Sequence, residues 1–401
     1  MFLNPYIAGN PIGGQAGFFG RDDILREVTQ VLRNPSSNAI VLYGQRRIGK
    51  TSTLLQLERQ LHALPDYAPV YFDLQDKAGK PLDAVLYELA QRICAVTGQA
   101  LADRDAFDPQ GTFFRDVFMP QAAKATANGS LVLLFDEFDV LDSPKKVQAG
   151  NAFFPYLRAW MGKEKGVQFV FVIGRRPEDL SINTISTFKG VRATRVSLLN
   201  EADAAAVVRQ SQTAGSLIWL DEVVEQVWHW AQGHPYFTQL LCSVVWENAY
   251  EDDPDEAPLI RVDDVDSAVD EALKQGANAF VWIWDGLPPA ERVVISAMAE
   301  AKSLIITHDD LVGILNQSGV RLIVHQLKLA PETLVEWELL QPANGGYRFS
   351  VRMLRYWVQK NRPLRRAKEE LDLLDPQAEA LFQTGQRFHQ AGQVDIARNQ
   401  L

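Results

Sequence analysis

The chain has 401 residues, of which 47% are hydrophobic and 22% are charged. At roughly 150 residues per domain this length predicts two to four domains, and the composition is that of a folded protein with large cores. The net charge of −10 argues against a general nucleic-acid coat protein. Two cysteines exclude a disulfide scaffold, and six scattered histidines predict no metal site. Because neither a signal peptide nor an apolar run of roughly 18 residues is present, we expect a cytoplasmic protein with no membrane partner.

The charge changes abruptly along the chain. Residues 1–198 carry a net charge of +3, residues 199–285 carry −14, residues 286–366 carry +4 and residues 367–401 carry −3. Such breaks indicate modules with different surfaces. We therefore expect four domains with these boundaries.

The first segment has the pattern of an α/β domain. Apolar runs rich in β-branched and aromatic residues alternate with stretches long enough for crossover helices, such as 51–63 and 81–97. A buried parallel sheet requires this alternation. The predicted strands are 38–43, 69–74, 130–135, 168–173 and 194–198.

The remaining segments are mainly helical in pattern. Residues 199–285 carry apolar residues at helical spacing and predict an all-α domain. Residues 286–366 resemble a winged helix-turn-helix, in which three helices precede a hairpin around the turn PANGG and a basic helix follows. The predicted helices are 290–301, 309–317, 322–328 and 351–366, and the predicted strands are 339–341 and 347–349.

The last 24 residues resemble the start of a tetratricopeptide repeat, and the sequence stops inside that repeat. One repeat cannot bury its own face, and about three are normally needed. We therefore expect the natural chain to continue as a helical array, with residues 367–401 as its beginning. A lone terminal pair of amphipathic helices is the simpler alternative.

A phosphate-binding motif follows the first predicted strand. Residues 44–51 read GQRRIGKT, match GxxxxGK[ST] and open a predicted helix. In this context backbone N–H groups and the helix N-terminus can surround phosphates, Lys50 can neutralise their charge, and the Thr51 hydroxyl can bind Mg²⁺. The predicted nucleotide contacts here are Gly44, Arg47, Ile48, Gly49, Lys50, Thr51 and Ser52.

A second acidic motif follows the third predicted strand. Asp136 is expected to hold Mg²⁺ through water, and Glu137 to orient or deprotonate the attacking water, which favours ATP hydrolysis. Asp139 is as easily a solvated turn residue as a functional one. The fourth strand ends in Arg175 and Arg176, and we expect Arg175 to sense the γ-phosphate.

In the order of its motifs, the chain resembles the STAND class of signal-transduction ATPases, closest to bacterial and archaeal members, over residues 4–366. Asn4-Pro5-Tyr6 followed by Phe18-Phe19-Gly20-Arg21 is similar to the family's adenine-side motif, and Gly233-His234-Pro235-Tyr236 is similar to its lid motif. The resemblance implies a five-stranded parallel sheet of order 5-1-4-3-2 and a nucleotide-binding P-loop domain, lid, winged helix and repeats. It also implies nucleotide contacts from Phe19, Gly20 and Arg21, with Pro235 near adenine and His234 near the phosphates.

The resemblance further implies a switch that binds ATP or ADP with Mg²⁺, hydrolyses ATP slowly and forms homo-oligomers when activated. An unknown protein or ligand would be sensed by repeats beyond residue 401.

Two other functions fit the same parts. The alternative is a DNA-binding initiator-type ATPase, because eight basic residues and no acidic ones lie between 348 and 368. These residues could instead form the solvated face of a helix, and the candidate recognition face at 321–338 has a net charge of −1, so DNA is expected to be an unlikely partner. A scaffold that binds nucleotide without switching is the third possibility.

Overall fold

The computed structural model describes residues 2–14, 16–34, 37–126, 129–142, 147–161, 166–174, 180–181, 186–251, 256–320 and 324–374. The chain divides into two compact units. The first comprises residues up to 228 together with 233–268, and the second comprises 229–232 and the residues from 269 onward. This division is coarser than the four expected domains, which therefore remain a prediction.

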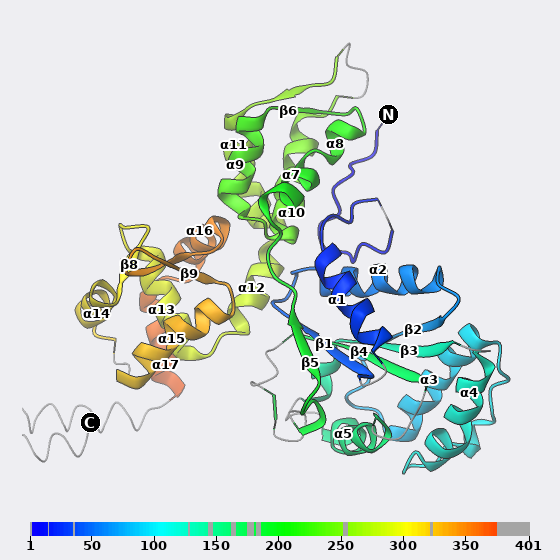
Figure 1. Ribbon diagram of the computed structural model, residues 1–401. Coiled ribbons are helices and arrows are strands. Elements are labelled where there is room, and N and C mark those ends of the chain that lie inside the picture. The colour runs from blue at the N-terminus through cyan, green and yellow to red at the C-terminus, as the bar shows by residue number, and fades with distance from the viewer. Residues whose placement is uncertain are drawn as a thin grey trace, which may run out of the picture. The chain divides into compact units, whose positions relative to one another are not determined.

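The first unit is built on a five-stranded parallel sheet (Figure 1). Its order, β2-β3-β4-β1-β5, is the expected order 5-1-4-3-2 read from the other edge, so this prediction is confirmed. Register is continuous at the centre, where Val41 of β1 pairs with Phe171 of β4. The strands are β1 (Ala39–Tyr43), β2 (Tyr67–Asp73), β3 (Ser130–Asp136), β4 (Val167–Ile173) and β5 (Arg192–Arg195).

Helices cover both faces of this sheet, and successive strand residues supply two separate cores. In β1, Ala39 and Val41 pack into one core while Ile40 and Leu42 pack into the other, as the two-residue period of a strand requires. The helices that complete these layers, with the short turns among them, are α1 (Asp22–Arg33), α2 (Lys50–His62), α3 (Leu82–Thr97), η1 (Arg104–Ala106), η2 (Phe114–Phe118), α4 (Met119–Ala125), η3 (Phe138–Asp142) and α5 (Val147–Met161).

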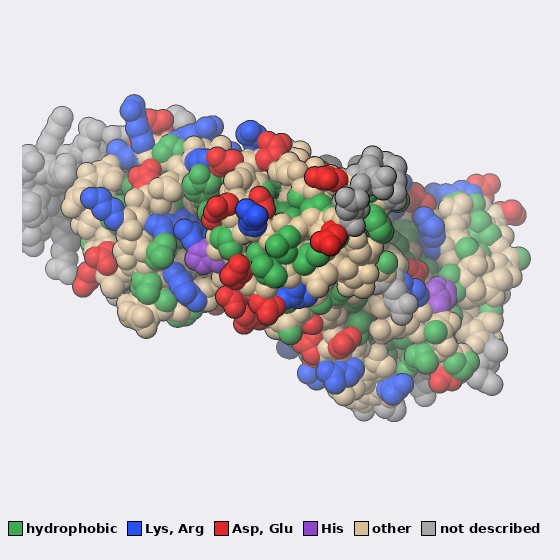
Figure 2. Space-filling view, turned by 90° about the horizontal axis from the view of Figure 1, so that it is seen from above, with side chains coloured by type: hydrophobic (Ala, Val, Ile, Leu, Met, Phe, Trp, Pro, Cys, Tyr) green, Lys and Arg blue, Asp and Glu red, His purple; other side chains and the backbone are tan. Residues whose placement is uncertain are grey.

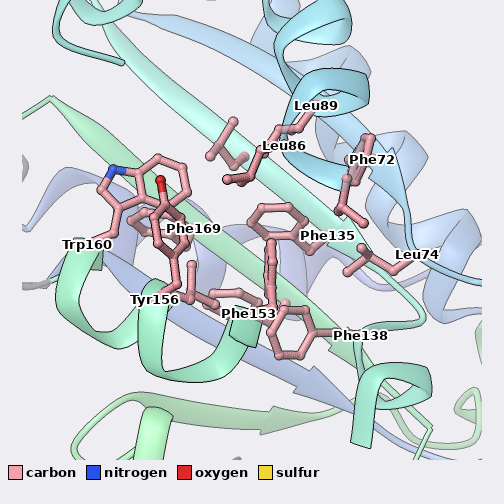
Figure 3. Packing of buried hydrophobic residues seen from close by; sticks show 14 of the residues in the cluster. Phe72, Leu74, Leu86, Leu89, Phe135, Phe138, Phe153, Tyr156, Trp160 and Phe169 are labelled. Carbon is pink, nitrogen blue, oxygen red and sulfur yellow. The ribbon is translucent and has the colours of Figure 1, made fainter. Parts of the chain in front are cut away.

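One of the two cores is rich in aromatic rings (Figure 3). Phe135 on β3 stacks on Phe171 on β4 with ring centroids 5.6 Å apart. Trp160 on α5 meets Phe169 edge to face at 5.1 Å. These rings surround the strand that ends at Asp136, so the apolar packing fixes the position of the acidic motif.

The part of the predicted lid that comprises residues 199–275, called the lid below, carries the expected helices and one element that was not expected. Its helices are α7 (Glu201–Val208), α8 (Gln210–Thr213), α9 (Asp221–Ala231), α10 (Pro235–Ala249) and α11 (Val262–Gln275), and the unit boundary falls inside α9 and α11. The prediction that residues 199–285 are all helical is wrong at one place. Strands β6 (Ile218–Trp219) and β7 (Leu259–Ile260) pair in parallel. A strand of two residues is too short to show an alternating pattern in the sequence.

The strongly negative charge of this segment lies on its surface. In Figure 2, which looks down on the lid, red acidic side chains gather over this part of the molecule. The exposed acidic residues of this segment include Asp221, Glu222, Glu225, Asp263, Asp264 and Asp266.

An N-terminal strap, residues 2–14, is fastened to the lid. The Asn4 amide donates to the Ser243 hydroxyl at 2.9 Å. The Tyr6 hydroxyl is 2.5 Å from the carbonyl of Val208 and 2.7 Å from the hydroxyl of Ser211, and Ser211 also accepts from the Trp219 indole at 2.7 Å. Because the Val208 carbonyl can only accept, Tyr6 gives it its proton and Ser211 donates to Tyr6. This chain of buried hydrogen bonds ties the first residues to the lid.

The second unit contains helices and a three-stranded sheet of order β8-β10-β9. The expected helices and hairpin have counterparts here, while the winged-helix assignment itself remains a prediction. The basic helix expected at 351–366 is divided instead, because Pro363 has no N–H to continue it. The elements are α12 (Ala277–Asp285), α13 (Pro289–Glu300), β8 (Ile306–Thr307), α14 (His308–Gln317), α15 (Val324–Glu336), β9 (Leu340–Ala343), β10 (Gly346–Phe349), α16 (Arg352–Asn361) and α17 (Leu364–Leu374).

Residues 375–401, which hold the predicted repeat, lie outside the described residues. In the part of the chain that is described, no helix has both the length and the apolar character needed to cross a membrane.

The strap contact predicts a measurable loss of stability. Replacing Tyr6 by Phe leaves the Val208 carbonyl and the Ser211 hydroxyl buried with one partner fewer, which should cost about 1–3 kcal/mol. Chemical denaturation of the two proteins measures this difference. Tyr87→Phe is the matched control, because its ring packs against Phe107 and the described contacts give its hydroxyl no hydrogen bond. Equal stability of the Tyr6→Phe protein and the wild type would contradict the proposed anchoring.

Candidate nucleotide site

The phosphate-binding loop joins β1 to α2, as the motif requires. Gly49 is the N-cap of α2 with φ of 93°, and Arg47 also has a positive φ of 66°. Gly44 has no room for a side chain, because a Cβ there would lie 2.4 Å from the carbonyl oxygen of Val196. The loop therefore packs closely against the residue that follows β5, and it leads directly into the first turn of α2.

Lys50 is buried at the start of α2, with only 6% of its surface exposed. Its ammonium donates to the carbonyl oxygens of Gly44 at 3.1 Å and Gln45 at 2.8 Å. Burial lowers the pKa of Lys50, and the nearby carboxylates of Glu137, Asp139 and Asp136 oppose that effect. The cation is thus held within the loop that it is predicted to serve.

Asp136 lies at the end of β3 and is 2% exposed. Its carboxylate accepts from the Tyr71 hydroxyl at 3.0 Å and from the Glu137 backbone amide at 3.0 Å. Burial raises the pKa of Asp136, while hydrogen bonds from Thr51, Tyr71 and the Glu137 amide lower it. Thr51 and Asp136, the two predicted metal residues, therefore interact with each other.

Glu137 follows in a left-handed backbone conformation, with φ of 50°. Burial raises its pKa, and Lys50 is the main group that lowers it. A carboxylate with a raised pKa accepts a proton more readily, which is the property required of a general base. Glu137 and Lys50 therefore influence each other's charge.

Asp139, which the sequence left ambiguous, has a definite contact. Its carboxylate accepts from the backbone amide of Gly174 at 2.9 Å, and a Cβ on Gly174 would lie 3.4 Å from the same carboxylate. This bond fixes the end of β4. Arg175 and Arg176 follow Gly174 but lie outside the described residues, so their predicted role remains a prediction.

The adenine-side motif lies between the loop and the lid. Arg21 is 8% exposed and donates to the carbonyl oxygen of Ile48 at 3.0 Å. Phe19 packs on a small apolar cluster of the lid that includes Leu199. Gly20 allows close approach, since a Cβ there would lie 2.4 Å from the Asp203 carboxylate.

The lid motif lies against the phosphate-binding loop. A Cβ added to Gly49 would be 4.0 Å from Cγ of Pro235, the first residue of α10. His234 caps this helix, and its Nδ1 accepts from the Phe237 amide at 3.5 Å. Because Nδ1 is the acceptor, a neutral His234 carries its proton on Nε2, and among the described residues this buried atom has no hydrogen-bond partner. Burial and the charge of Arg21 lower the pKa of His234 to about 3, so the ring is neutral at physiological pH.

Arg47 joins three segments that the sequence did not connect. It donates to the carbonyl oxygen of Gly9 in the strap at 2.6 Å, and its guanidinium lies 5.1 Å from the ring centroid of Tyr236 in the lid. Nearby, the Ser52 hydroxyl accepts from the amide of Ile12 at 2.9 Å. Local sequence patterns contain no signal for these contacts, because the partners come from distant parts of the chain.

The residues present fit a nucleotide phosphate with Mg²⁺. The loop and the N-terminus of α2 supply N–H groups, Lys50 supplies a cation, and His234 has a buried donor that lacks an acceptor among the described residues. Thr51 and Asp136 supply the oxygen ligands that Mg²⁺ prefers. Within the described ranges, no group of three or more His, Cys, Asp or Glu residues could hold a metal alone.

Comparison with known proteins gives structural matches only. No protein-family profile and no curated protein matches the chain. A Walker-type ATPase of Pyrococcus abyssi is similar with a TM-score of 0.64 at 11% identity, over 87% of this chain and 98% of that one. The Orc1 protein of Aeropyrum pernix in complex with DNA has a TM-score of 0.44 at 16% identity, over 86% of this chain and 93% of that one. The RuvB Holliday junction branch migration motor of Thermotoga maritima has a TM-score of 0.43 at 12% identity, over 83% of this chain and 92% of that one.

The chain has the P-loop NTPase fold. The strand order and the first of these similarities establish the fold and no more, because the identity is low. The fold alone does not assign roles to the residues gathered at the P-loop.

The buried imidazole predicts a pH dependence of stability. The folded state holds the pKa of His234 at about 3, below the roughly 6.5 of an unfolded histidine. Between these values the unfolded chain binds one more proton, so stability falls as the pH drops below about 6.5, by up to about 1.4 kcal/mol per pH unit. Above that pH the contribution is constant.

His234→Asn keeps a helix-capping acceptor and removes this titration, so its stability should fall less steeply from pH 6.5 to 4. Denaturation midpoints measured across this range test the difference. His308→Asn, at an exposed position, is the matched control. Parallel pH profiles for the wild type and His234→Asn would contradict the assigned neutral state.

Proposed function

We propose that the protein is an ATP- and ADP-binding molecular switch of the STAND type that hydrolyses ATP slowly. The observation that carries this proposal is the buried Nε2–H of His234, at the start of a lid helix whose next residue, Pro235, lies beside Gly49 of the P-loop. A phosphate on the loop supplies an acceptor for that donor. One nucleotide would then bind the loop and the lid together.

The binding roles follow from the contacts. Lys50 neutralises phosphate charge from within the loop, and the amides at the start of α2 donate to phosphate oxygens. Arg21 fixes the loop at Ile48, and Phe19 presents an apolar surface between the loop and the lid. These contacts support adenine-side binding by residues 19–21.

The catalytic roles depend on the acidic motif. Bound Mg²⁺, held by Thr51 and Asp136, would neutralise charge on the β- and γ-phosphates. Glu137 accepts a proton from the attacking water, and its raised pKa favours this role. Lys50 lies close enough to lower the pKa of Glu137, so the base and the phosphate-binding cation act on one another.

Switching requires a ligand that binds two arrangements of the lid with different affinity. His234 and Pro235 on α10 and Arg47 in the loop are the residues through which that difference can arise, because they join the lid to the P-loop. We propose that ADP stabilises the closed arrangement and that ATP favours an open one that forms homo-oligomers. Repeats beyond residue 401 would receive the signal from a partner.

The initiator-type alternative is compatible with the P-loop fold, and the contacts of its basic residues are what weigh against it. Of the eight basic residues between 348 and 368, most have partners inside the second unit rather than free faces for a phosphate backbone. These partners are aromatic rings for Arg352 and Arg362, backbone carbonyls for Arg355, and carboxylates for Lys360, Arg365, Arg366 and Lys368. Salt-dependent binding of the protein to duplex DNA would support this alternative.

The first test is the nucleotide that the purified protein carries. Denaturation followed by anion-exchange chromatography of the supernatant should release near-stoichiometric ADP from the wild type. Lys50→Ala should carry none and should not bind added ADP, because it removes the buried cation of the loop. Lys124→Ala, at an exposed position of the same unit, should match the wild type. Undiminished binding by Lys50→Ala would overturn the nucleotide site.

The second test separates binding from hydrolysis. Glu137→Gln removes the base without changing the size of the side chain, so it should retain ATP and hydrolyse it about 10²-fold or more slowly. Single-turnover hydrolysis and ATP affinity are measured on the same preparation, with Glu201→Gln on the lid surface as the control. An unchanged rate would exclude Glu137 as the base.

A further inference from the structure

Tyr71 occupies a position on the sheet from which it reaches the acidic motif. In the parallel pairing of β2 with β3, Tyr71 is level with Leu134 and Asp73 is level with Asp136. Tyr71 and Asp136 are therefore diagonal neighbours on the same face of the sheet, since side chains two residues apart share a face. The length of the phenol spans this diagonal, and its hydroxyl lies 3.0 Å from Oδ2 of Asp136.

The bond from Tyr71 helps to satisfy a carboxylate that has little access to water. Asp136 is 2% exposed, and the Glu137 amide donates to its other oxygen, Oδ1, at 3.0 Å. Donors to both oxygens fix the orientation of the carboxylate and stabilise its charged form in a buried place. The Tyr71 hydroxyl is the donor in this bond, because a carboxylate oxygen accepts.

Tyr71 is itself held by the helix that carries the P-loop threonine. The Tyr71 backbone amide interacts with the carboxylate of Glu58 on α2, and Thr51 on the same helix interacts with Asp136. Thr51 and Glu58 are seven residues apart, about two turns, and so lie on one side of α2. The helix, the edge strand β2 and the end of β3 are thus joined by one closed circuit of polar contacts.

From this circuit we propose that Tyr71 is a positioning residue for the Mg²⁺ carboxylate. Its hydroxyl holds the Asp136 carboxylate in one orientation, so that Mg²⁺ meets a preset ligand beside Thr51. Tyr71 does not contact the metal or the nucleotide, and it acts only through Asp136. The inference rests on the proposed nucleotide-binding function and adds a residue to it that no sequence motif contains.

The test is the Mg²⁺ dependence of ADP binding by Tyr71→Phe, which removes the hydroxyl and keeps the ring. A fluorescent ADP analogue is titrated at a series of Mg²⁺ concentrations and again in EDTA. We expect the Mg²⁺ concentration at half-maximal effect to rise about tenfold or more, as for other residues that support a metal ligand, with the affinity in EDTA unchanged. Tyr67→Phe is the matched control on the same strand, since no described residue bonds to its hydroxyl.

The outcomes distinguish the role of Tyr71 from nucleotide binding itself. An unchanged Mg²⁺ dependence in Tyr71→Phe, or an equal shift in Tyr67→Phe, would overturn the inference. Loss of ADP affinity in EDTA would also overturn it, because Tyr71 would then support the fold of the site rather than the metal ligand. Failure of the wild type to bind ADP under any condition would instead reject the proposed function itself.

Discussion

The buried charge of Lys50 is the constraint on which the site depends. An ammonium removed from water must be compensated by nearby acceptors, or it loses its proton. Two P-loop carbonyls bond to it directly, and the carboxylates of Asp136, Glu137 and Asp139 act on it from the neighbouring strand end. Lys50 in turn lowers the pKa of Glu137. Lys50 and Glu137 therefore each stabilise the charged form of the other in their buried places.

The order of strands is what allows this compensation. β4 lies between β1, which leads into the P-loop, and β3, which leads into the acidic motif. The carboxyl ends of parallel strands meet at the same edge of the sheet, so segments distant in the sequence converge there. Asp139 spans the gap by accepting from the Gly174 amide at the end of β4. Both apolar cores stabilise this arrangement, because neighbouring residues of each strand are buried on opposite faces.

The strands of the sheet could be predicted because their signals are local: apolar runs of strand length, helical spacing between them, and a motif with a known place at a strand end. Their order, by contrast, was implied by the family resemblance and not by local signals. The contacts that complete the site could not be predicted, because they join distant segments. Tyr71 has no motif, and its role depends on the register of β2 with β3. Arg47 lies in the P-loop, yet its partners are Gly9 in the strap and Tyr236 in the lid. The break at Pro363 was visible in the sequence and follows from the missing N–H.

The strap, the lid and the P-loop are joined with unequal strength. Between strap and lid, the bonds of Tyr6 are buried, and breaking such a bond costs about 1–3 kcal/mol. The P-loop and the first turn of α2 are joined to the strap by an exposed bond from Arg47 to Gly9 and a part-buried bond from the Ile12 amide to Ser52. They are joined to the lid by a cation–π contact between Arg47 and Tyr236, and Pro235 lies near Gly49. Exposed cation–π contacts contribute only about 0.5–1 kcal/mol. The lid is therefore joined more strongly to the strap than to the P-loop. In the proposed function, a phosphate that bonds to both His234 and the P-loop would add its energy at this weaker contact. Under the proposed switch, a ligand placed there would have the greatest effect on the balance between closed and open arrangements, because its contacts would exist in only one of them.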